Sequence, residues 1–147
     1  MGKHSVRVIL DEEVTTMGRW SWNVEPDATA IAATRHHVVG VVCGCCPNHA
    51  SIDTDALALA TSELVTNALR HGQPPIEVRV DTDNDAHARV EVSDACWDEP
   101  FIRAPDDAGG RGLPIVQAVA SRAGWRHADH GKVVWFEIAT APSEAAA

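Results

Sequence analysis

The spacing of apolar residues predicts short strands in both halves of the chain. Residues two apart lie on the same face of a strand, so alternating apolar and polar positions indicate strands with one buried face. The polar run 81–85 predicts an antiparallel hairpin, and a turn at 129–131 predicts a second one. Trp20 and Trp22, also two apart, indicate a further short strand or an edge segment. The predicted strands cover residues 5–10, part of 11–25, 76–80, 87–93, 124–128 and 132–138.

Three other segments carry apolar residues at the three- and four-residue spacing of a helix. Pro26 and Pro114 suit a first helical turn, where the missing N–H would have no partner in any case. Asp53 or Thr54 is expected to cap the middle helix, and Gly72 is expected to end it in a left-handed conformation. The predicted helices cover residues 26–42, 54–71 and 113–123.

These elements predict a single domain over residues 1–140, followed by a disordered tail at 141–147. A chain of 147 residues is long enough for one hydrophobic core. Because the later strands are linked by hairpins, the sheet is expected to be mostly antiparallel. The predicted fold class is α+β, a two-layer α/β sandwich whose sheet is covered on one face by about three helices.

The charge balance disfavours classes of partner that need a basic surface. The chain has 21 acidic and 12 basic residues, a net charge of −9, which disfavours non-specific binding to nucleic acids and to anionic membranes. A secretory leader and an apolar run of about twenty residues are both missing, so we expect a cytoplasmic protein. The four cysteines are then expected to be reduced thiols.

Cys43, Cys45, Cys46 and His49 form the one cluster that invites a metal interpretation, because thiolates and imidazoles bind soft transition metals. The spacing is poor for a zinc site, which usually has two residues between paired cysteines and a second pair elsewhere. The alternative is that the thiols are small buried groups where Gly44 and a proline end the first helix. Both interpretations remain open from sequence.

Polar residues also recur along the middle helix. Glu63, Asn67 and His71 are each four residues apart and so share one face, which is either a solvated stripe or part of a site. The segment 95–111 is long for a structureless connection and is typical of a functional lid. It ends in the glycine-rich run 109–112 at the start of a helix, where backbone N–H groups can bind an anion. The run is neither a Walker loop nor a dinucleotide fingerprint.

The order of these pieces resembles the ATP-binding domain of the GHKL superfamily, the Bergerat fold of gyrase-type enzymes. Within it, three motifs look like the small stand-alone actinobacterial proteins of the anti-sigma-factor serine/threonine kinase family. The resemblance covers about residues 18–140. The motifs are Ser62–Gly72, Gly109–Leu113 followed by Val116, and Gly131–Glu137.

The resemblance implies ATP and Mg²⁺ as cofactors and assigns a role to several residues. Asn67 would hold the Mg²⁺, and Glu63 would act as the catalytic base toward a hydroxyl of a protein substrate or a water. Asp94 would accept a hydrogen bond from the adenine amino group. The residues implied to flank the nucleotide or to present N–H groups and charge to its phosphates are Arg70, His71, Gly110, Arg111, Gly112 and Leu113.

Two positions depart from the family pattern. Cys96 stands where relatives have a glycine two residues after the aspartate, and Val133 stands about where many relatives carry a threonine beside that aspartate. Both departures bear on the adenine end of the site. Trp97 is expected to pack in the core or the lid rather than against the adenine.

The implied function is that of an ATP-dependent serine/threonine protein kinase that phosphorylates an anti-anti-sigma partner, sequesters a sigma factor, or does both. Such a protein would regulate transcription without contacting nucleic acid or a membrane, and relatives form homodimers. The alternative is a non-catalytic protein-binding regulator with weak or no nucleotide binding. Glu63 favours the kinase, whereas Cys96 and Val133 favour the alternative.

Overall fold

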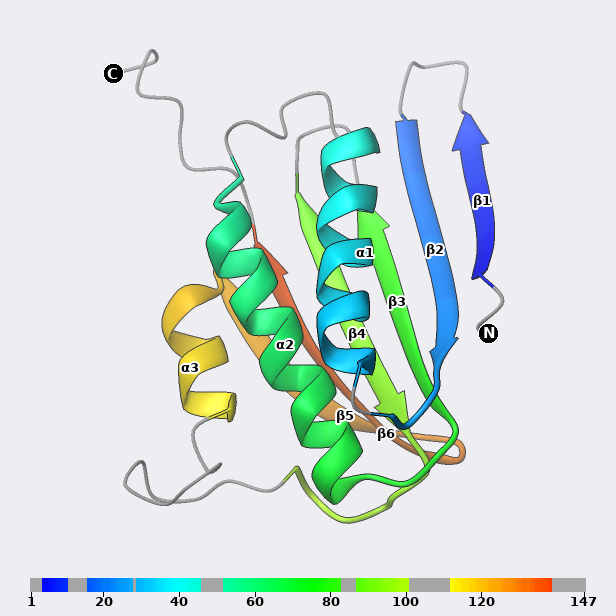
Figure 1. The fold of residues 1–147 in the computed structure, drawn as a ribbon, viewed down its shortest axis with the longest axis vertical. Coiled ribbons are helices and arrows are strands. Elements are labelled where there is room, and N and C mark those ends of the chain that lie inside the picture. Colours follow the sequence, from blue (N-terminus) through cyan, green and yellow to red (C-terminus); the bar gives the residue numbers. More distant parts are fainter. Residues whose placement is uncertain are drawn as a thin grey trace.

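A six-stranded sheet with three helices on one face makes up the described fold (Figure 1). The structure is a computed structural model that describes residues 4–10, 16–27, 29–45, 52–82, 87–100 and 112–138. The strand order is β1-β2-β3-β4-β6-β5, and every neighbouring pair is antiparallel. The α+β two-layer architecture predicted from the sequence is therefore confirmed. The strands are β1 (His4–Leu10), β2 (Thr16–Val24), β3 (Ile76–Thr82), β4 (Ala88–Asp94), β5 (Arg122–Ala128) and β6 (Gly131–Ile138).

The helices are α1 (Ala30–Cys45), α2 (Thr54–His71) and α3 (Gly112–Val119). In Figure 1, α2 lies between α1 and α3 over the middle of the sheet. None of the helices in the described ranges is long and apolar enough to cross a membrane. The predicted tail at 141–147 lies outside the described residues.

The core lies between the helices and one face of the sheet. Alternate residues of the central strands point toward the helices, and the register places Val80 opposite Val90 and Val90 opposite Phe136. These three side chains are fully buried, as are Leu57 of α2 and Val38 of α1. The intervening residues of the same strands point to the other face of the sheet, which has no covering helix in Figure 1.

The middle helix was predicted with the correct ends, and its cap is explained by the structure. Asp53 is the N-cap residue, and its side chain accepts a hydrogen bond from the N–H of Ala56 at 3.0 Å. This bond satisfies one of the N–H groups that have no partner within the helix. The choice between Asp53 and Thr54 is thus resolved in favour of Asp53.

The limits predicted for the other two helices were wrong. The first helix begins at Ala30 rather than Pro26, because Asp27 Oδ1 accepts from the N–H of Thr29 at 2.8 Å and holds a turn before the helix. It also continues through Gly44 to Cys45. The third helix ends at Val119 rather than at residue 123, since the chain from Arg122 onward joins the sheet as β5.

Candidate functional site

Glu63, Asn67 and His71 lie on the flank of α2 that faces α3. Ser62 marks the opposite flank, because its hydroxyl accepts a hydrogen bond at 3.3 Å from Arg35 of α1. Successive residues of a helix are rotated by about 100° about its axis. Glu63 therefore lies across the surface of α2 that faces away from the sheet, on the flank opposite Ser62 and α1. Asn67 and His71 follow Glu63 at four-residue steps, and Figure 1 shows α3 beside α2 on the side away from α1.

The side chains on this flank are accessible to a ligand. Glu63, Asn67 and His71 are each half-buried, and Arg70 is exposed. Within the described part of the chain, neither the Glu63 carboxylate nor the Asn67 amide has a hydrogen-bond partner. An amide oxygen without a partner is a suitable donor to a hard cation such as Mg²⁺, which prefers oxygen ligands and keeps several waters. The residues present therefore fit the implied metal.

Asp94 ends β4 beneath the C-terminal end of α2 and is 5% exposed. Its Oδ1 accepts hydrogen bonds from the N–H of Cys96 at 2.8 Å and from the N–H of Gln73 at 3.4 Å. The same oxygen is 3.1 Å from the ammonium of Lys132. One buried carboxylate thus ties together the end of β4, the end of α2 and the start of β6.

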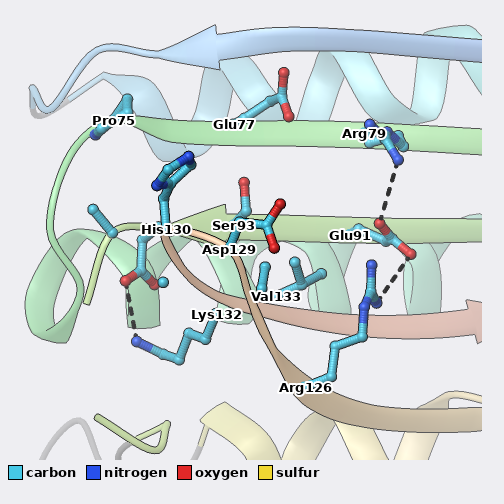
Figure 2. Close-up of a pocket in the computed structure, with 14 residues that line it drawn as sticks. Pro75, Glu77, Arg79, Glu91, Ser93, Arg126, Asp129, His130, Lys132 and Val133 are labelled. Carbon is cyan, nitrogen blue, oxygen red and sulfur yellow. Dashed lines mark hydrogen bonds and ion pairs between the residues drawn. The ribbon is translucent and has the colours of Figure 1, made fainter. Parts of the chain in front are cut away.

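The residue beside Asp94 in the last strand is Lys132, and the expectation that Val133 stands there was wrong. The antiparallel register pairs Asp94 with Lys132 and Ser93 with Val133. Directly opposite residues share a face of the sheet, so Lys132 lies on the helix side with Asp94 and Val133 lies on the other face. Figure 2 shows the ion pair of Lys132 as a dashed line.

Two glycines allow the backbone to approach Asp94 closely. A Cβ on Gly72 would lie 2.4 Å from Asp94 Cγ, and one on Gly131 would lie 1.9 Å from the Asp94 carbonyl oxygen. Gly131 also has a φ of +156°, which L side chains rarely adopt. Gly72 instead has φ −93° and ψ −169°, so the predicted left-handed C-cap was wrong. Its glycine is required by the contact with Asp94, not by its backbone conformation.

The glycine-rich run before α3 is only partly described. Gly110 and Arg111 lie outside the described residues, and α3 begins at Gly112 and includes Leu113. In Figure 1 the start of α3, the end of α2 and the end of β4 lie at the same end of the molecule. The elements that carry Asn67, Asp94 and Leu113 therefore converge on one region of the helix side.

The residues after Asp94 show how the chain leaves the sheet. Cys96 is 9% exposed, and its N–H is one of the donors to Asp94, so a cysteine at this position keeps the backbone contact. Trp97 is 56% exposed, so its predicted packing in the core was wrong. Residues 101–111 of the predicted lid lie outside the described residues, so packing of Trp97 against the lid stays a prediction. Its ring lies 4.7 Å from that of His127, and His127 Nε2 is 3.0 Å from the Trp97 carbonyl oxygen.

The cysteine cluster is only partly described. Cys43 has a free, half-buried thiol near the end of α1. Cys46 and His49 lie outside the described residues, so the proposed metal cluster stays a prediction. Elsewhere in the described chain, no group of three or more histidine, cysteine or acidic residues could hold a metal ion.

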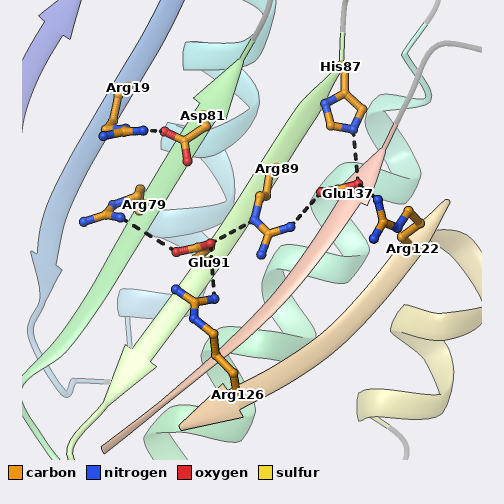
Figure 3. Close-up of polar contacts among 9 residues, drawn as sticks. All are labelled: Arg19, Arg79, Asp81, His87, Arg89, Glu91, Arg122, Arg126 and Glu137. Atoms are coloured by element: carbon orange, nitrogen blue, oxygen red, sulfur yellow. Dashed lines mark hydrogen bonds and ion pairs between the residues drawn. The ribbon is translucent and has the colours of Figure 1, made fainter. Parts of the chain in front are cut away.

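The uncovered face of the sheet carries a network of ion pairs that the sequence analysis missed. Arg89 joins two carboxylates, with its Nε 2.8 Å from Glu91 and its Nη1 2.6 Å from Glu137 (Figure 3). Arg126 adds a contact of 3.5 Å to Glu91, and Arg122 one of 3.5 Å to Glu137. The signal was present in the sequence, because arginine and glutamate alternate with valine along the predicted strands.

The network keeps both carboxylates ionised. Burial raises the pKa of Glu91, but the hydrogen bond from Arg89 and the charge of Arg126 outweigh it and hold the pKa below its ordinary value. Burial likewise raises the pKa of Glu137, and Arg89, His87 and Arg122 together lower it below the ordinary value.

A cavity of about 480 Å³ opens on this uncovered face, at the end of the sheet near Asp129 and His130. Figure 2 shows Glu77, Arg79 and Ser93 along its wall. Asp94 and Lys132 also line it, so the cavity reaches the buried ion pair at the end of β4.

Comparisons with known proteins agree with this geometry. Residues 24–138 match the model of the histidine kinase-like ATPase domain family. Among solved structures, the RsbU and RsbW domains of Rv1364c from Mycobacterium tuberculosis match with a TM-score of 0.62 and 18% sequence identity, over 85% of this chain and 33% of that chain. This likeness shows the fold, and the chain spans about a third of that protein's length. No curated protein sequence matches. Because the family match covers most of the chain, the protein belongs to the histidine kinase-like ATPase domain family, as its motifs predicted.

Proposed function

We propose that the protein binds Mg²⁺–ATP on the helix side of the sheet and transfers the γ-phosphoryl group to a serine or threonine of an anti-anti-sigma partner. The observation that carries the proposal is the line of half-buried polar residues on α2, with Glu63 and Asn67 free of partners among the described residues. That line faces α3 and leads toward a buried carboxylate at the end of β4. Membership in the ATPase family supports the same assignment.

Glu63 is the proposed catalytic base. In the transfer, the bond between the γ-phosphorus and the β-bridging oxygen breaks, and the hydroxyl oxygen of the partner bonds to that phosphorus. The hydroxyl proton passes to the Glu63 carboxylate, and ADP leaves. Asn67, one helical turn away, would supply an amide oxygen to Mg²⁺, and the ion would neutralise charge on the phosphates. The short separation along α2 keeps the base close to the metal-bound phosphates.

The two ends of the nucleotide are assigned to different elements. Asp94 accepts a hydrogen bond from the adenine amino group. The phosphates are bound by N–H groups of Gly110, Gly112 and Leu113 at the start of α3, with charge from Arg111. Arg70 and His71 flank the nucleotide from the end of α2.

The partners are proposed from the family resemblance. A regulator of this class would bind a sigma factor and release it when its anti-anti-sigma partner is available, and would act as a homodimer in the cytoplasm. The fold likeness to a chain that contains an RsbW domain supports this assignment. The net charge of −9 agrees with a protein that acts through other proteins rather than on nucleic acid directly.

Isothermal titration with ATP, with and without Mg²⁺, tests the binding step. We expect binding that strengthens with Mg²⁺, and we expect Asn67→Ala to abolish that dependence. No binding at millimolar ATP would overturn the proposal.

Transfer of labelled γ-phosphate to candidate anti-anti-sigma proteins from the same organism then tests the chemistry. Glu63→Gln should retain ATP binding and lose transfer, because the amide cannot accept the proton. Glu77→Gln on the uncovered face is the matched control and should transfer normally. Equal transfer by wild type and Glu63→Gln would remove Glu63 as the base. Binding without transfer to any candidate would favour the non-catalytic regulator.

A further inference from the structure

The cavity on the uncovered face is lined by charges of both signs. Asp94 and Lys132 neutralise each other in a buried ion pair of 3.1 Å. Glu91 is held at 2.8 Å by Arg89, a residue that does not line the cavity. The remaining charged groups are two carboxylates and two guanidiniums, those of Glu77, Arg79, Arg126 and Asp129. Their charges sum to zero, so the cavity favours a ligand that carries both signs and no net charge.

The two guanidiniums are held loosely by the protein itself. Arg79 Nη1 lies 3.9 Å from Glu91 Oε1, beyond hydrogen-bond distance, and Arg126 Nη1 lies 3.5 Å from Glu91 Oε2. Their side chains are 41% and 50% exposed, so a ligand can reach them. A guanidinium carries five N–H donors. A second carboxylate can therefore bind Arg79 and Arg126 while Glu91 keeps its short ion pair with Arg89.

The two carboxylates lack a counter-charge. Within the described residues, neither Glu77 nor Asp129 has an ion pair or a side-chain hydrogen bond. Figure 2 shows both toward the end of the cavity that the β5–β6 turn forms, with the guanidiniums toward the other end. Val133, which is 6% exposed, provides an apolar surface between the two ends. The cavity is therefore negative at one end and positive at the other.

We propose that this cavity binds a zwitterion of dipeptide size, whose carboxylate contacts Arg79 and Arg126 and whose ammonium contacts Asp129. Guanidiniums bind carboxylates through paired N–H groups, which fixes the orientation of the ligand. Glu77 and Arg79 are two residues apart on β3, so the ends of opposite charge are about 7 Å apart. An extended dipeptide separates its termini by about the same distance. The volume of about 480 Å³ is also in the range of small-molecule sites.

Titration of the isotope-labelled wild-type protein with glycylglycine, followed by the amide NMR signals of Ser93 and Val133, tests the proposal. We expect saturable shifts. N-acetylglycylglycine lacks the ammonium and glycylglycinamide lacks the carboxylate, so each should bind about tenfold more weakly or worse. Glycine keeps both charges but holds them too close together, and it should also bind weakly. No saturable shift at millimolar glycylglycine, or equal binding of the blocked forms, would overturn the proposal. ATP binding is measured separately, so the proposed function would still stand.

Two variants separate the two ends of the ligand. Arg126→Met should bring glycylglycine and glycylglycinamide closer in affinity, because the partner of the carboxylate is lost. Asp129→Asn should do the same for glycylglycine and its N-acetyl form. Arg19→Met is the matched control, since this exposed guanidinium pairs with Asp81 outside the cavity and should leave every affinity unchanged. Circular dichroism checks that each variant is folded, and the wild-type titrations decide if one is not. Affinity differences that persist in both variants, or a loss of binding in Arg19→Met, would overturn the assigned contacts.

Discussion

Replacing Gly72 by alanine tests how tightly Asp94 is held. The backbone of Gly72 has φ −93° and ψ −169°, which any residue adopts, so its φ and ψ values do not themselves require glycine. The added Cβ would lie 2.4 Å from Asp94 Cγ and 2.8 Å from the Ala68 carbonyl oxygen, and ordinary contact begins at 3.4 Å, so Asp94 must move by about 1 Å. A movement of that size away from Lys132 would lengthen an ion pair of 3.1 Å beyond hydrogen-bond distance.

The expected loss in the free energy of unfolding is about 2–4 kcal/mol, between the usual cost of overpacking and that of breaking a buried ion pair. Urea unfolding followed by circular dichroism measures it. With a typical slope, the midpoint should fall by about 1–2 M while the slope itself stays constant. The loss should appear without nucleotide, since the contact lies within the free protein.

Gly40→Ala is the matched control for the same chemical change. A Cβ on Gly40 meets no described atom within 4 Å, and the residue lies inside α1, so alanine should stabilise the protein by about 0.5–1 kcal/mol. The cost of Gly72→Ala should also shrink when Asp94 is truncated to alanine, because the two residues are in direct contact. A Gly72→Ala variant as stable as Gly40→Ala, or a cost independent of Asp94, would refute the reasoning.

Three further predictions concern stability. The folded-state pKa values of Glu91 and Glu137 lie below the ordinary 4.5, so their stabilising contribution is complete above about pH 4.5 and is lost as the pH falls through the folded pKa. The urea midpoint of the wild type should therefore fall between pH 6 and pH 3, and that of Arg89→Met should fall less. An equal fall in the two proteins would contradict this. Asp53→Ala should cost about 0.5–2 kcal/mol through the lost helix cap, measured in the same way, and an unchanged midpoint would count against the cap. Leu64→Ala should cost about 2–5 kcal/mol because Leu64 is 1% exposed, and a loss below 1 kcal/mol would mean that the core collapses around the gap.

The sequence predicted the elements whose local signals agree with their tertiary environment. The helix at 54–71 has a capping aspartate, a continuous apolar stripe and a closing glycine, and its bounds were correct. The start of the first helix could not be found in this way, because Pro26 fits a first turn equally well and the deciding contact is the hydrogen bond of Thr29 to Asp27. Residues after Val119 have helical character, but pairing with β6 places Arg122 in a strand.

In the candidate site too, the sequence predicted what depends on local spacing and not what depends on contacts between strands. Glu63 and Asn67 could be placed on one helix face from their spacing alone. The partner of Asp94 could not, because a shift of one residue in register exchanges the two faces of a strand. The family resemblance therefore pointed to Val133, whereas the register makes Lys132 the neighbour of Asp94 on the helix side.

The strand order has a consequence for how the protein folds. β1–β2, β3–β4 and β5–β6 pair between neighbouring segments of the chain, whereas β2 pairs with β3 across both α1 and α2. Closing a long loop costs more chain entropy than closing a turn, so contacts between distant segments form late. We expect the β3–β4 and β5–β6 pairs and α2 to be structured in the folding transition state, and β2 to join β3 later, so φ-values should be near 1 at Val90 and near 0 at Trp22. The reverse order would mean that the sheet assembles from its N-terminal half.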